Sequence, residues 1–121
     1  DVIDLIAPEG WMRTANHTDR VGDIAIYLAG HEHPEQIYDM VPDLVFEVVS
    51  EGSEERDYVV KRKEYYDLGI QEYVIVDPFR KVVVVLTPNG EGYADQELQS
   101  SDTYRSSLLP GFTLSLTELP W

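Results

Sequence analysis

The sequence predicts one small α/β or α+β domain in which strands flank a single helix. The chain has 121 residues, a length that suits one hydrophobic core. A hydrophobic fraction of 43%, with eight Tyr, three Phe and two Trp, is enough to form that core. Strand-sized apolar runs stand on both sides of one segment with helical periodicity. We therefore expect residues 1–121 to form a single domain.

Three strands are predicted in the first part of the chain. Residues 2–6 suggest a short strand, followed by a turn at residues 8–10, where Pro and Gly flank Glu. Residues 22–28 form a β-type apolar run. Residues 43–49 are strongly strand-forming and lie between a proline and the Glu51-Gly52 pair, so we expect an interior strand there.

A helix is predicted after the third strand. Ser53 is typical of a helix N-cap, and Glu54 and Glu55 follow where negative charge meets the positive end of the helix dipole. We expect the helix to run to Leu68 and to end at Gly69.

Mostly extended structure is predicted for the rest of the chain. Strands over residues 72–76 and 81–86 are separated by a turn at Asp77-Pro78. A turn at residues 88–90 predicts a hairpin into a strand over residues 92–98. Residues 107–116 suggest another short extended piece.

Glu47 is a carboxylate in the middle of an otherwise apolar strand. Alternation places Asp43, Val45, Glu47 and Val49 on one face of that strand. A buried charge is costly unless it is paired, hydrogen-bonded or bound to a metal, so Glu47 is a candidate site residue. The alternative is an edge strand whose polar face meets water.

Lys61 falls on an aromatic-rich stripe of the predicted helix, together with Tyr58, Tyr65 and Leu68. A stripe of this kind can face the sheet and carry the ammonium inward. The alternative is an exposed Lys with Asp57 as its i,i+4 partner, which contributes at most about 0.5 kcal/mol. Periodicity leaves the buried face open, because Val59 and Tyr66 form a second, smaller apolar stripe.

Asp23 opens the strand before Glu47 and follows Gly22 directly. Carboxylates from two neighbouring strands suit a hard divalent cation, which takes one or two of them and leaves its other positions to water and phosphate. Two carboxylates and one Lys also meet the needs of phosphodiester hydrolysis. Asp23, Glu47 and Lys61 are therefore the candidate catalytic residues.

Several motifs follow one another along the chain: GDIAI at 22–26, PDLVFEVVS at 42–50, Arg56-Asp57, Lys61, Tyr65, Gly69, EYVIVDP at 72–78 and SLLPGF at 107–112. The motifs from 42 to 78 resemble the signature stretch of the Uma-two family. The segment at 107–112 resembles the closing motif of that family, and the segment at 22–26 is similar to its earlier Pro-Asp strand, with Gly22 in place of the usual Pro.

This resemblance implies a restriction-endonuclease-like fold of the PD-(D/E)XK superfamily, a mixed β-sheet with a helix packed on it. It also implies a Mg²⁺-dependent DNA endonuclease, in which Mn²⁺ is expected to substitute. By the resemblance, Asp23 and Glu47 are metal ligands and Asp43 is an additional candidate. Lys61 replaces the Lys of the Glu-x-Lys motif, because Val49 occupies that position. The family carries an N-terminal helix before the first Asp strand, and we expect this chain to lack it.

The net charge of the chain affects whether it can bind DNA. Nine Lys and Arg against 23 Asp and Glu give a net charge of -14, which opposes general nucleic-acid binding. Six of the nine cations fall in one region, namely Arg56, Lys61, Arg62, Lys63, Arg80 and Lys81. We expect a local basic face there, with Arg56, Arg62 and Lys63 as candidate DNA contacts. The competing hypothesis is an inactive nuclease-fold protein that acts as a dimerisation or protein-interaction module.

The sequence also bears on other kinds of site and on the cellular location of the protein. It has no cysteine, so thiolate sites and disulfides are excluded. His31 and His33 lack the spacing of a zinc hydrolase. The longest apolar runs are far short of a membrane span, and the first residues do not resemble a secretory signal, so we expect a cytoplasmic protein without a membrane partner. Strand edges and the Val82–Val85 run suggest a homodimer.

Overall fold

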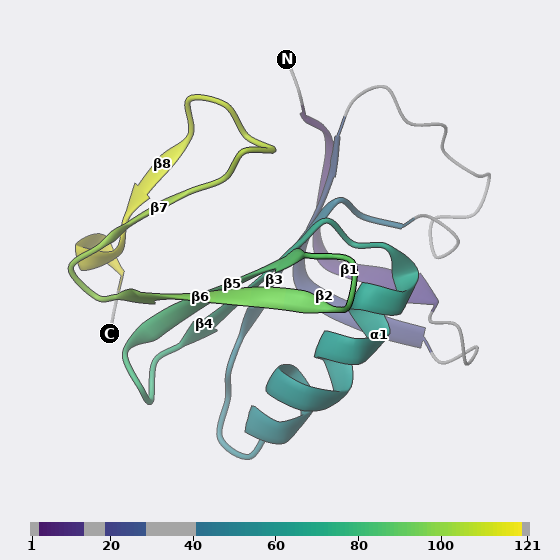
Figure 1. Cartoon of the computed structure of the whole chain (residues 1–121), viewed down its shortest axis with the longest axis horizontal. Helices are drawn as coiled ribbons and strands as arrows, with labels where there is room; N and C mark the ends of the chain where they lie inside the picture. Colours follow the sequence, from purple (N-terminus) through teal and green to yellow (C-terminus); the bar gives the residue numbers. More distant parts are fainter. Residues whose placement is uncertain (1–2, 14–18, 29–40, 120–121) are drawn as a thin grey trace.

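The fold is a mixed six-stranded sheet with one helix packed on one face (Figure 1). The computed structural model describes residues 3–13, 19–28 and 41–119, and gives only the backbone for residues 3–13 and 19–22. The strand order is β1-β2-β3-β4-β5-β6, so each strand lies beside its neighbour in sequence. Strands β3 and β4 are parallel, and the helix connects them, because parallel neighbours need a long crossover.

The two N-terminal strands form an antiparallel pair. Strand β1 (Ile3–Arg13) pairs with β2 (Asp19–Leu28). The turn predicted at residues 8–10 is wrong, because Pro8 and Gly10 lie inside β1, opposite Ile24 and Gly22. Since β1 is the edge strand of the sheet, a residue without a backbone N–H is tolerated there.

The interior strand and the helix are confirmed. Strand β3 (Leu44–Val48) is followed by a helix that begins with a π-helical turn, Arg56–Val60, and continues as α1 (Lys61–Leu68). Gly69 ends the helix in the left-handed region at φ 88°, a conformation that favours glycine. The chain then enters β4 (Glu72–Asp77).

The predicted hairpin is confirmed by β5 (Val82–Pro88) and β6 (Tyr93–Gln99), which pair antiparallel. A small second sheet joins β7 (Thr103–Arg105) to β8 (Thr113–Ser115), and a 3-10 turn follows at Leu116–Glu118. The sequence pattern did not predict β7, which has three residues and is too short for a visible alternation.

The Val82–Val85 run, which suggested an exposed edge, lies inside the sheet. Strand β5 is hydrogen-bonded to β4 on one side and to β6 on the other, and these valines are buried. The Val82–Val85 run therefore offers no exposed edge for self-association, and dimerisation stays a prediction.

Buried side chains cover both faces of the sheet. On one face the helix packs against the strands, with Tyr65, Ile70, Tyr73, Ile75, Val84 and Leu86 among the buried side chains. On the other face the C-terminal segment packs through Tyr104 and Leu116 against Val74, Val83 and Val85. Figure 1 shows α1 and the β7–β8 pair on opposite sides of the sheet.

Candidate functional site

The helix places Lys61 against the sheet. Tyr65 is fully buried beneath the helix, and Tyr58, Tyr66 and Leu68 pack partly buried against the same core. Val59 is 60% exposed, so the Lys61 stripe faces the sheet and only Tyr66 of the second stripe reaches this core. The Nζ atom of Lys61 contacts Glu47 Oε2 and lies 3.5 Å from Asp57 Oδ1.

Glu47 is buried on the helix-facing side of β3, with 2% of its surface exposed. The alternative of an edge strand in water is wrong, because β3 lies between β2 and β4 and Val45 and Val49 share the helix-facing core. Burial raises the pKa of Glu47, while the hydrogen bond and charge of Lys61 lower it and the charge of Asp23 raises it further. Glu47 is thus a carboxylate whose ionised form depends on nearby cations.

Asp23 and Glu47 meet where β2 and β3 separate. The pairing of the two strands ends at Ile24 and Phe46. One residue further along, backbone N–H groups donate to side chains instead of to the backbone of the opposite strand. The N–H of Asp23 donates to Glu47 Oε1 at 2.8 Å. In return, the N–H of Val48 donates to Asp23 Oδ2 at 2.6 Å. The structure therefore brings the carboxylates together, with Asp23 exposed to solvent and Glu47 buried.

Asp57 is a third acid in this cluster. Its residue is 3% exposed, and its Oδ2 accepts a hydrogen bond from Ser53 Oγ at 2.7 Å. The alternative of a solvent-exposed Lys61–Asp57 pair is wrong, because both side chains are largely buried. The exposed fraction is 11% for Lys61 and 4% for Asp57. The i,i+4 spacing to Lys61 was the visible signal, but sequence reasoning did not assign Asp57 to the site.

Asp43 lies apart from this cluster. It stands four residues before Glu47, a separation of roughly 13 Å along a strand. Its Oδ2 accepts a hydrogen bond from the N–H of Leu28 at 2.8 Å. Asp43 therefore holds β2 at the other end of β3, and the structure does not bring it to Lys61.

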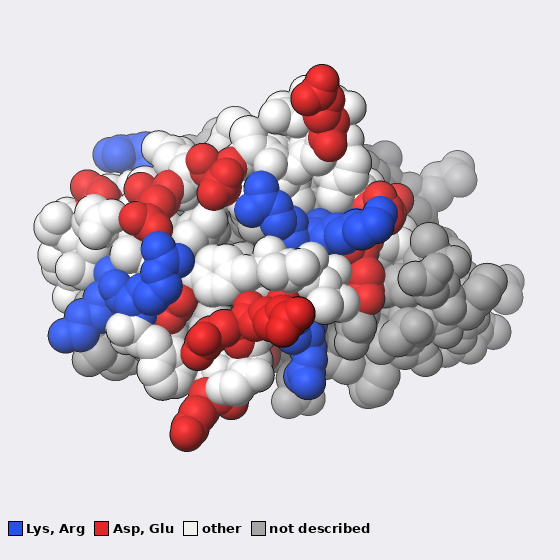
Figure 2. Space-filling model, turned by 60° about the horizontal axis from the view of Figure 1, so that its bottom comes forward, with Lys and Arg blue, Asp and Glu red and all other residues white. Residues whose placement is uncertain are grey.

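The candidate DNA contacts lie among acidic side chains. Arg62 donates to the Tyr93 carbonyl at 2.8 Å and lies 3.6 Å from Asp95. Lys63 pairs with Asp67 at 3.0 Å, and Arg56 is exposed at the start of the π-helical turn. Figure 2 shows Lys and Arg interspersed with Asp and Glu on the face that it presents.

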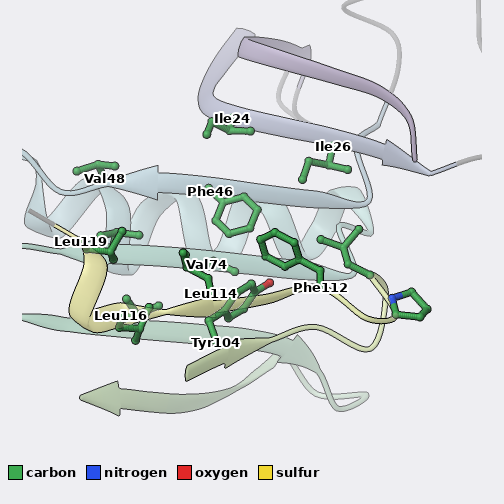
Figure 3. Close-up of a pocket in the computed structure, with 14 residues that line it drawn as sticks. Ile24, Ile26, Phe46, Val48, Val74, Tyr104, Phe112, Leu114, Leu116 and Leu119 are labelled. Atoms are coloured by element: carbon green, nitrogen blue, oxygen red, sulfur yellow. The ribbon is translucent and has the colours of Figure 1, made fainter. Parts of the chain in front are cut away.

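An apolar cavity occupies the opposite face of the sheet. It has a volume of about 590 Å³ and lies between the strands and the C-terminal segment, where Phe46, Tyr104 and Phe112 contribute to its lining (Figure 3). Its lining contains no Asp, Glu, His, Lys or Arg among the described residues. The cavity therefore has none of the groups that phosphodiester hydrolysis needs.

The donor set of the Glu47 cluster suits a hard divalent cation. No group of three or more His, Cys, Asp or Glu placed to hold a metal occurs within residues 23–28 and 41–119, the part whose side chains are described. Magnesium does not require three, because it is held by one or two carboxylates together with water and phosphate. A carboxylate has about four acceptor positions, so Asp23 and Glu47 keep acceptor capacity beside the bonds that they already make.

His31 and His33 lie outside the described residues. The helices of the described residues include none with the length and hydropathy of a membrane span.

The mixed sheet with one helix packed on it is a restriction-endonuclease-like fold. The chain belongs to the Uma2 family, described as "Putative restriction endonuclease", whose model matches residues 5–117. No curated protein matches the chain.

A solved structure supports the fold. It is a protein from Anabaena variabilis ATCC 29413 described as a putative nuclease belonging to DUF820. The TM-score is 0.72 at 18% sequence identity, over 93% of this chain. The chain spans 65% of the length of that protein.

Proposed function

We propose that this protein is a metal-dependent DNA endonuclease that hydrolyses phosphodiester bonds at the Asp23–Glu47–Lys61 cluster. The observation that carries the proposal is the buried contact between Lys61 and Glu47 beside the carboxylate of Asp23. Membership of a family described as restriction endonucleases supports DNA as the substrate.

Each of the three residues has a distinct role in this proposal. Asp23 and Glu47 would hold Mg²⁺ or Mn²⁺, with Asp23 on the solvent side and Glu47 on the buried side. When bound, the cation would neutralise charge on the phosphodiester and acidify a water molecule. Lys61 supplies a fixed positive charge. Its ammonium group would donate a hydrogen bond to the phosphate as negative charge develops in the transition state.

A plasmid-nicking assay with Mg²⁺ tests this function. We expect nicking by the unaltered protein and a loss of about 100-fold or more in Glu47→Ala and Lys61→Ala, since each removes a charge that acts on the transition state. Glu97→Ala and Arg105→Ala are matched controls, because they remove exposed charges of the same signs away from the cluster. Equal nicking in all five proteins would exclude this site.

The net charge of -14 favours a second candidate, a catalytically inactive nuclease-fold protein that serves as a dimerisation or protein-interaction module. Metal titration discriminates between the two candidates. Failure of both Mg²⁺ and Mn²⁺ to bind at millimolar concentration would favour the second.

A further inference from the structure

We infer that Asp57 is a positioning residue that holds Lys61 in the site when a divalent cation occupies Glu47. This inference rests on the proposed function and adds a residue to it. Lys61 lies between two buried carboxylates, in contact with Glu47 and 3.5 Å from Asp57 Oδ1. It therefore has a second partner as soon as Glu47 turns to another cation.

The helix geometry fixes Asp57 on the inner side. The π-helical turn Arg56–Val60 ends at Lys61, whose N–H donates to the Arg56 carbonyl five residues earlier. Turns of this kind are frequent at functional sites. The backbone carbonyl of Asp57 also accepts a hydrogen bond from the buried Tyr73 hydroxyl at 2.7 Å, which ties this turn to β4.

Ser53 orients the carboxylate of Asp57. Its hydroxyl lies 2.7 Å from Asp57 Oδ2, and the same oxygen of Ser53 accepts a hydrogen bond from the Ser50 N–H at 2.9 Å. Hydrogen bonding on Oδ2 leaves Oδ1 directed toward Lys61. A chain of contacts thus runs from the loop after β3 through Ser53 and Asp57 to the ammonium.

Charge repulsion makes the second partner necessary. A divalent cation on Glu47 would repel the ammonium, because charges in a partly buried site are screened less than in water. Without Asp57, Lys61 would either compete with the cation for Glu47 or stay buried without an anion, and both alternatives weaken cation binding.

The test compares Mn²⁺ affinity and plasmid nicking in Asp57→Asn and Asp67→Asn. Both variants remove one charge from an i,i+4 Lys–Asp pair on the same helix, but Asp67 is exposed and pairs with Lys63. We expect Asp57→Asn to bind Mn²⁺ roughly 10-fold more weakly, the effect typical of residues that orient a metal site. Its nicking rate should fall while the KM for DNA stays unchanged, and Asp67→Asn should behave like the unaltered protein.

Ser53→Ala keeps the inference testable if Asp57→Asn does not fold. Ser53→Ala keeps the buried charge of Asp57 but removes the hydroxyl that hydrogen-bonds it. It should weaken Mn²⁺ binding by a smaller factor than Asp57→Asn does. The inference is overturned if Asp57→Asn binds Mn²⁺ as tightly as Asp67→Asn does. If Asp57→Asn does not fold, the same result for Ser53→Ala overturns it. Either result leaves the proposed function standing. Absence of Mn²⁺ binding by the unaltered protein would instead overturn the proposed function, and the inference with it.

Discussion

Glu47 and Lys61 form an ion pair that is almost fully removed from water, with 2% and 11% of their side chains exposed. A buried pair of this kind contributes little net stability compared with apolar residues, but loss of one partner leaves an uncompensated charge. The pair is therefore better explained by the chemistry of the site than by the stability of the fold.

Lys61→Met tests whether Glu47 and Lys61 interact in solution. We expect the free energy of unfolding to fall by about 3 kcal/mol, because Glu47 loses the cation that supports its charge. Urea denaturation at pH 7 measures it. The double variant Glu47→Gln, Lys61→Met should recover part of the loss, since the charge of Glu47 is removed while that of Asp57 stays without its Lys61 partner. A single variant as stable as the unaltered protein would show that the two side chains do not interact in solution.

Sequence reasoning could identify Glu47 and Lys61, because strand alternation and the helical stripe each placed a charge among apolar residues. Asp23 was assigned mainly by its place beside Gly22 in a motif. The burial of Asp57 could not be predicted in this way, because it lay on the margin of the stripe and its position depends on a local π-helical turn. Asp43 was predicted on the same strand face as Glu47. Strand alternation does not show which end of the strand carries the site, so it could not exclude Asp43.

Among the elements, β4 is joined to the C-terminal segment by a buried carboxylate. Glu72 is 3% exposed, accepts a hydrogen bond from the Tyr104 hydroxyl, and accepts a second from Ser106 Oγ at 3.1 Å. Burial raises the pKa of Glu72 above its ordinary value of 4.5, and the two hydrogen bonds oppose this shift.

Glu72→Gln tests this link through the pH dependence of stability. Between 4.5 and the raised pKa, the native state binds more protons than the unfolded state. The free energy of unfolding therefore falls as pH rises through that window, and this contribution stays lost above it. Urea denaturation at pH 4 and pH 8 should show that Glu72→Gln gains stability relative to the unaltered protein at the higher pH. An equal difference at both pH values would contradict the assigned shift.

Most elements could be predicted because they carry regular patterns. Strands β3, β4 and β5 have continuous apolar runs, and the helix has a serine before it and a glycine after it. Strand β1 was cut short in the prediction because proline and glycine usually interrupt strands, whereas an edge strand accommodates them. Strand β7 is fixed by tertiary packing, since Tyr104 is buried against the sheet.

At the scale of the whole molecule, the two faces of the sheet differ in chemistry. The helix-facing side carries the buried charges of Glu47, Lys61 and Asp57. The other side carries the apolar cavity and the carboxyl group of Glu72, which is bonded to Tyr104 and Ser106. A net charge of -14 repels the phosphate backbone, so a divalent cation at Asp23 and Glu47 would also reduce the repulsion at the point of contact. Sequence reasoning predicted the sheet and the charge, but the cavity depends on how the C-terminal segment packs.

The structure of crystals soaked in Mn²⁺, with the ion located by its anomalous scattering, tests the central claim most directly. We predict one Mn²⁺ bound by carboxylate oxygens of both Asp23 and Glu47, with Lys61 retained beside Asp57. An ion bound elsewhere, or no ion near these two carboxylates at millimolar Mn²⁺, would contradict the proposed site.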